Sequence, residues 1–145
     1  MDFSRQNIES AFSTLYNGND KEITDANAFL MEWTQTPECP LTAFEIFAES
    51  NNFQHQSMAL SILYRQIQNC WSHFDDIFRN SVKEFFFKLL LEGFPSPTIE
   101  RTFISIIVLI AIYEWPEVFP DYFELIFDLE NYTYLFHIIS EFLSL

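Results

Sequence analysis

The spacing of the three tryptophans constrains the fold of this chain more than any other feature. Trp33, Trp71 and Trp115 lie 38 and 44 residues apart, each at or near the end of a segment that predicts a long apolar helix. A recurrence of about 40 residues with two helices per unit is typical of solenoids built from helical hairpins. Such a hairpin cannot bury its apolar face alone, so it has to stack on neighbours. The spacing therefore favours an extended binding surface over a catalytic pocket.

The composition favours a folded chain made of helices. Its 145 residues are 49% hydrophobic and 19% aromatic, with 18 Phe, which excludes a disordered chain. Only 2 Gly are present, and alternating β-branched runs with turn dipeptides are scarce. The length suits one domain that can bury a sizeable core. We therefore expect an all-α domain.

Start and stop signals predict eight helices in pairs. These helices are expected to begin near residues 2–4, 20, 40, 53, 75, 97, 120 and 131. Four hairpins with short connections predict an α-α superhelix of the HEAT or armadillo kind, although a compact bundle would give a similar pattern. The last helix ends at Leu145 with its apolar stripe unfinished and no polar cap. We therefore expect the chain to be the start of a longer array, or to have its end covered by a partner.

The charge is strongly acidic. The chain holds 21 acidic and 7 basic residues, a net charge of −14, and no Lys or Arg follows Arg101. Such a potential repels nucleic acid and anionic lipid and attracts basic partners. Alternatively, the acidity only keeps a very apolar chain soluble.

The cysteines, the N-terminus and the length of the most apolar stretch predict a soluble, intracellular protein. Cys39 and Cys70 are isolated, which favours two buried thiols over a metal or redox motif. The N-terminus, MDFSRQNIES, lacks the basic and apolar regions of a signal peptide. The most apolar stretch, residues 103–112, is about half the length of a membrane span.

No pattern in the sequence predicts an enzyme or a cofactor. His55 and His73 have no acidic or Cys partner at ligand spacing, and His137 with Glu141 supplies only two ligands for a metal. Asp75 and Asp76 are best explained as charges at the start of a helix, where the dipole favours them. Gly18 and Gly93 stand alone, so no glycine-rich loop for a phosphate is present.

Three blocks of residues lie in the order and at the distances found in a known protein family. The first is Leu15-Tyr16, followed by residues 26–30 (ANAFL) with Trp33 and Gln35. The second is residues 59–67 (ALSILYRQI) with Trp71. The third, residues 114–121 (EWPEVFPD), is similar to a Trp-Pro-x-x-Trp-Pro turn with Phe119 in place of the second Trp, and residues 138–143 (IISEFL) are similar to the helix that follows it. Together the three blocks resemble the importin-β superfamily of nuclear transport receptors, which includes the exportins.

The resemblance implies a single N-terminal HEAT-repeat domain over residues 1–145. Residues 15–71 are the importin N-terminal-like part, and residues 98–145 are the exportin-like repeats. In this family the N-terminal repeats bind the small GTPase Ran in its GTP form, through the second helix of each hairpin on the concave side. A segment of a receptor that shuttles between nucleus and cytoplasm is therefore implied, with Ran and protein cargo as partners. The resemblance does not separate importins from exportins.

Two predicted helices have polar faces suited to that role. On the predicted helix that begins near residue 20, the polar face lies opposite the apolar stripe that ends at Trp33. On the predicted helix that begins near residue 53, polar residues at i, i+3/i+4 spacing form a strip. The candidate Ran-binding residues are Lys21, Asp25, Glu32, Gln35, Gln54, Ser57, Ser61, Arg65 and Gln68. Both faces could equally be ordinary solvated surface. The alternative function is a free-standing helical scaffold or adaptor that binds a basic protein.

Overall fold

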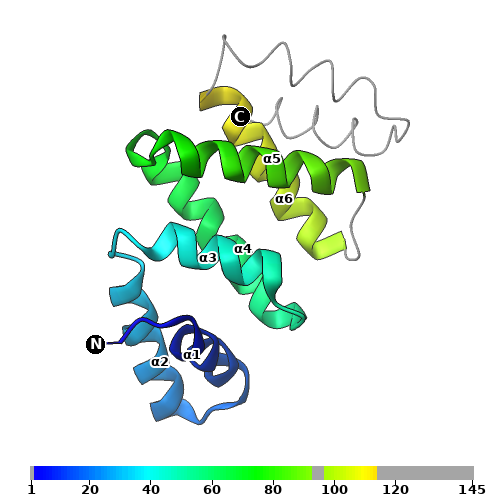
Figure 1. The fold of residues 1–145 in the computed structure, drawn as a ribbon. Helices are drawn as coiled ribbons and strands as arrows, with labels where there is room; N and C mark the ends of the chain where they lie inside the picture. The colour runs from blue at the N-terminus through cyan, green and yellow to red at the C-terminus, as the bar shows by residue number, and fades with distance from the viewer. Residues whose placement is uncertain (1, 93–96, 114–145) are drawn as a thin grey trace. The chain divides into compact units, whose positions relative to one another are not determined.

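The computed structural model describes residues 2–92 and 97–113, and the regular structure of these residues is entirely helical (Figure 1). The helices are α1 (Arg5–Asn17), α2 (Asp20–Trp33), α3 (Cys39–Glu49), α4 (Phe53–Cys70), α5 (Asp76–Glu92) and α6 (Pro97–Tyr113), with the short 3-10 helix η1 (Trp71–His73) after α4. The predicted all-α class and the hairpin arrangement are confirmed. The two helices expected near residues 120 and 131 lie outside the described residues, so the fourth hairpin stays a prediction.

The chain divides into two compact units, and the division falls inside α4, between Leu63 and Tyr64. The first unit holds α1, α2, α3 and the first part of α4. The second unit holds the remainder of α4 with η1, α5 and α6. A single helix therefore belongs to both units.

The turn between α1 and α2 depends on a glycine because two helix ends meet closely there. The Gly18 N–H donates to the carbonyl oxygen of Thr14 at 2.8 Å and so closes the end of α1. A Cβ atom on Gly18 would lie 2.8 Å from that same oxygen and 3.1 Å from Cβ of Glu22. Side chains larger than hydrogen do not fit without a shift of the backbone. This turn separates α1, which ends at Asn17, from α2, which begins at Asp20.

The core of the first unit forms where α1 packs against α2 and α3. The ring of Phe12 meets Trp33 edge to face, with centroids 6.1 Å apart, and both side chains are fully buried. On α1 and α2 the buried residues lie at helical spacing and are Ile8, Ala11, Phe12, Ala26, Leu30 and Trp33. Leu41 of α3 is apolar but 50% exposed. On α3 the buried face is made by Cys39, Ala43, Ile46 and Phe47 instead.

The second unit is built on contacts between α5 and α6. Phe86 and Phe103 pack with ring centroids 5.1 Å apart, and both are buried. Helix α6 is buried nearly all round from Phe103 to Ala111, as its apolar sequence predicts. On α5, Phe85 and Phe87 are half-buried, so the aromatic run there is packed rather than displayed.

Two further expectations can be compared with the structure. Cys39 is buried as predicted, but Cys70 is only half-buried, so the prediction of two buried thiols is correct for Cys39 alone. None of the helices in residues 2–92 and 97–113 combines the length and the apolar character needed to cross a membrane.

Candidate functional site

The predicted polar face of α2 is open to solvent. Lys21, Asp25 and Glu32 are exposed and lie opposite the buried Ala26 and Leu30. This orientation follows from the sequence, because three apolar residues at helical spacing take the inner face and leave the polar ones outside. Gln35 is also exposed, but it lies just after the end of α2.

The predicted strip on α4 is open as well. Gln54, Ser61, Arg65 and Gln68 are exposed, and Ser57 is half-buried. The backbone carbonyl of Gln68 accepts a hydrogen bond from the Tyr113 hydroxyl at 2.7 Å. This bond does not involve the Gln68 side chain. Within the described part of the chain, neither Lys21 nor Arg65 takes part in an ion pair. The polar groups of both faces are therefore available to a partner.

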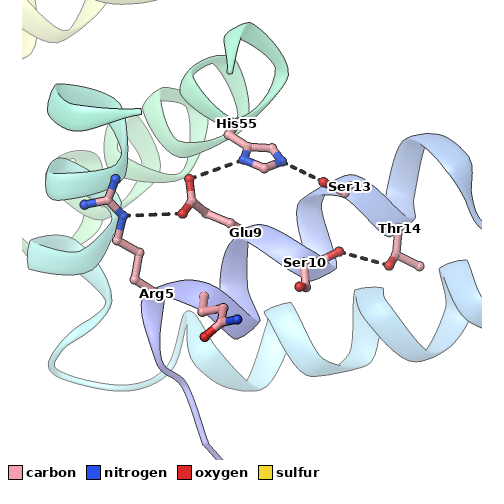
Figure 2. Close-up of a pocket in the computed structure, with 7 residues that line it drawn as sticks. Arg5, Glu9, Ser10, Ser13, Thr14 and His55 are labelled. Atoms are coloured by element: carbon pink, nitrogen blue, oxygen red, sulfur yellow. Dashed lines mark hydrogen bonds and ion pairs between the residues drawn. The ribbon is translucent and has the colours of Figure 1, made fainter. Parts of the chain in front are cut away.

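A second feature is an open hollow of about 650 Å³ on the first unit (Figure 2). The residues that line it all have polar or charged side chains and are Arg5, Gln6, Glu9, Ser10, Ser13, Thr14 and His55. Six of these residues come from α1, while His55 lies in the first turn of α4. The hollow therefore lies where the side chains of α1 meet the beginning of α4.

A chain of polar contacts crosses this hollow, as the dashed lines in Figure 2 show. The Ser13 hydroxyl lies 2.8 Å from Nε2 of His55, and Nδ1 of the same ring lies 3.3 Å from Oε1 of Glu9. The other oxygen of Glu9 accepts from Nε of Arg5 at 3.4 Å. Arg5 also forms an ion pair with Glu49. The hydrogen bond to Glu49, with the nearby charge of Glu9, raises the pKa of Arg5, which keeps the guanidinium charged.

This network stabilises the packing of α1 against the first turn of α4. His55 is only 9% exposed, and its ring also packs against Phe12 with centroids 6.0 Å apart. A polar ring buried to this degree needs partners for its nitrogens, since an unpaired buried group costs free energy. Glu9 and Ser13 supply these partners.

The order Ser13–His55–Glu9 is the order of hydrogen bonds in a Ser–His–acid triad, but its surroundings differ from those of an active site. In such enzymes, backbone N–H groups near the serine stabilise the oxyanion. Ser13 lies inside α1, where the helix itself uses the backbone N–H groups. The arrangement therefore has the hydrogen-bond order of a triad, but the backbone N–H groups of α1 around Ser13 form no oxyanion hole.

Sequence reasoning missed this network. It found no acidic partner for His55 because it compared residues at short spacing, whereas Glu9 lies 46 residues away. Among the described residues, no group of three His, Cys, Asp or Glu side chains could hold a metal ion. The prediction for His137 and Glu141 lies outside the described residues.

The charge pair expected at a helix start is found where it was predicted. Oδ1 of Asp75 accepts a hydrogen bond from the Phe78 N–H at 2.7 Å, which satisfies one of the free donors at the start of α5. Asp76 is the first residue of α5 and forms an ion pair with Arg79. The two carboxylates therefore have a structural role at this helix start.

Comparison with known proteins finds a family model that matches the segment with the α4 face and the later part of the α2 face. Residues 26–92 match the family model of the importin-beta N-terminal domain. No curated protein matches the chain. The match begins at Ala26 within α2, covers α3 and α4 completely, and ends with α5 at Glu92. Residues 26–92 are therefore similar to importin-beta N-terminal domains, which confirms the predicted resemblance to the importin-β superfamily over these residues.

Proposed function

We propose that the chain is a segment of a nuclear transport receptor and that its N-terminal helices bind Ran in the GTP form. The observation that supports the proposal most directly is the match of residues 26–92 to the family model of the importin-beta N-terminal domain. Seven of the nine candidate Ran-binding residues lie inside the matched segment, and Lys21 and Asp25 precede it on α2. Eight of the nine are exposed, and Ser57 is half-buried.

The chemistry of the two faces suits a protein partner better than a small ligand. They expose amides, hydroxyls and charges of both signs along the outer faces of two helices. Small-molecule sites are usually concave and mostly apolar. Protein interfaces have polar rims, and charges there set orientation and association rate. We therefore assign Lys21, Asp25, Glu32 and Arg65 to steering, and the Gln and Ser side chains to hydrogen bonds.

The expected place of action is the nucleus and the cytoplasm, since a receptor that depends on Ran moves between them. Protein cargo would bind to other parts of such a receptor. The role proposed for this segment is binding and not catalysis.

The test is a binding assay with the full chain and purified Ran, loaded either with a non-hydrolysable GTP analogue or with GDP. We expect tighter binding of the GTP form. Asp25→Lys and Arg65→Glu should each weaken that binding, by about tenfold for a rim charge that becomes repulsive. Glu45→Lys on α3 and Lys88→Glu on α5 are matched charge reversals at other exposed positions and should leave the affinity unchanged.

Two results would count against the proposal at different levels. Equal binding of both nucleotide forms, or no binding, would remove Ran as the partner. A preference for the GTP form that survives both reversals would keep Ran and show that the contact surface lies elsewhere.

The acidic charge supports a second candidate, a helical scaffold that binds a basic protein. Residues 1–63 hold nine acidic and two basic side chains, a net charge of −7. Binding of a basic partner would not depend on whether GTP or GDP is present, and its affinity would fall steeply as the salt concentration rises. The nucleotide dependence in the assay above separates the two candidates.

A further inference from the structure

Three hydroxyl side chains in the described residues are followed by an acidic residue at the third position. They are Thr42 with Glu45, Ser72 with Asp75, and Ser81 with Glu84. Protein kinases select substrates by charge patterns around the hydroxyl, and one class reads a carboxylate at this position. All three share this carboxylate, and Ser72 alone among them has a second one, Asp76, at the fourth position.

The structure separates them by backbone conformation. Thr42 is half-buried inside α3. Ser81 lies in the middle of α5, and its hydroxyl donates to the carbonyl oxygen of Ile77 at 3.0 Å. A kinase cleft takes up an extended segment, so either helix would have to unwind before the hydroxyl could reach ATP. Each would lose several helix hydrogen bonds in doing so.

Ser72 has neither obstacle. It is exposed and lies in η1, which has only three residues. The backbone at Phe74 is already extended, with φ −75° and ψ 144°. In the described structure the Ser72 hydroxyl forms no hydrogen bond with another residue. Fewer helix hydrogen bonds therefore have to be lost for this hydroxyl to reach a kinase than at Thr42 or Ser81, since η1 is closed by the bond from the Phe74 N–H to the carbonyl oxygen of Trp71.

The acidic residues after Ser72 are also presented to solvent. Asp75 and Asp76 are both exposed, and the side chain of Asp76 is 86% exposed although it pairs with Arg79. Both carboxylates remain accessible at the surface, at the third and fourth positions after the hydroxyl. A basic groove on a kinase could bind them together.

We propose that Ser72 is a phosphorylation site for an acid-directed serine/threonine kinase. In the reaction, Oγ of Ser72 attacks the γ-phosphorus of Mg²⁺-bound ATP, the bond from that phosphorus to the bridging oxygen breaks, and ADP leaves. The hydroxyl proton passes to the catalytic base of the kinase. The product carries about two additional negative charges three residues before the carboxylate that caps α5.

The test uses the full chain, Mg²⁺-ATP and a purified acid-directed kinase whose requirement for a carboxylate at the third position has been verified on a reference peptide. We expect one phosphate per chain, located at Ser72 by tandem mass spectrometry. Ser72→Ala should abolish the incorporation, whereas the matched Ser81→Ala should not change it. The double variant Asp75→Asn/Asp76→Asn should slow it by about tenfold or more, because charge-assisted contacts to the kinase are lost.

The asparagine variants keep a side chain that can cap α5, so loss of the helix does not explain a slower reaction. Circular dichroism of each variant checks the fold. Phosphate on Ser81 or Thr42 in place of Ser72 would overturn the proposal. So would an unmodified chain under conditions in which the reference peptide is phosphorylated.

Discussion

At the scale of single residues, the contact between Glu9 and His55 joins α1 to the first turn of α4. Glu9 and His55 are less exposed than Glu49, the acid of the neighbouring ion pair with Arg5. The side chain of His55 is 11% exposed and that of Glu9 is 24% exposed, whereas the side chain of Glu49 is 62% exposed. Both acids bind Arg5, but only Glu9 also satisfies a buried ring. The two carboxylates should therefore contribute unequally to stability.

We predict that Glu9→Ala lowers the free energy of unfolding by about 1–3 kcal/mol, because Nδ1 of His55 loses its acceptor in a nearly buried site. Glu49→Ala removes an ion pair with an exposed partner and should cost less than about 1 kcal/mol. Urea unfolding followed by circular dichroism measures both values. Equal losses for the two variants would show that the network acts only through the charge of Arg5.

At the scale of elements, the start of α2 is determined by hydrogen bonds in its first turn. The side chain of Asn19 accepts from the Glu22 N–H at 2.9 Å, and the Glu22 carboxylate accepts from the Asn19 N–H at 3.1 Å. The two bonds form a capping box, which satisfies free N–H groups at the helix start. The cap also sets where the exposed face of α2 begins.

Asn19→Ala should therefore destabilise the chain by about 1 kcal/mol, the usual cost of losing such a cap. Asn27→Ala is the matched control, since Asn27 is exposed in the interior of α2 and alanine is the better helix former there. Thermal unfolding should show a lower midpoint for Asn19→Ala and an unchanged or slightly higher one for Asn27→Ala. Similar midpoints for both variants would contradict a role for the cap.

The helices could be predicted from the sequence because their signals are local. The turn at Gly18, the proline near the start of α3 and the acids before α5 each lie within a few residues of the boundary that they mark. Apolar spacing then identified the buried faces, and the polar residues left over gave the exposed ones. Leu41 differs because apolar character alone does not say on which side of a short helix a residue lies.

The network at His55 could not be predicted in the same way. Glu9 and Ser13 reach the ring from 46 and 42 residues away, so only the packing of α1 against the start of α4 brings them together. Ser72 and Ser81 both have a carboxylate at the third position, and the structure adds that Ser81 lies in the interior of α5. Long-range contacts and local backbone conformation are therefore what the structure adds.

At the scale of the whole molecule, the shared helix α4 connects the two compact units. Its buried stripe includes Ala59 and Leu63 in the first unit and Ile67 in the second, all fully buried. Because a helix forms cooperatively, part of α4 is hard to unfold while the rest stays intact. We therefore expect both units to unfold in one transition, although each has a core of its own.

Two tryptophans make this expectation measurable, since Trp33 lies in the first unit and Trp71 in the second. Variants that keep one of them and replace the other two tryptophans by phenylalanine report on each unit by fluorescence. Leu63→Ala should lower the free energy of unfolding by about 2–5 kcal/mol, the usual cost of truncating a fully buried leucine. If α4 couples the units, the free energy of unfolding reported by Trp33 and that reported by Trp71 should fall by the same amount. Asn69→Ala, on the exposed face of α4, should leave both values unchanged. A loss seen only by Trp33 would mean that the two units unfold independently.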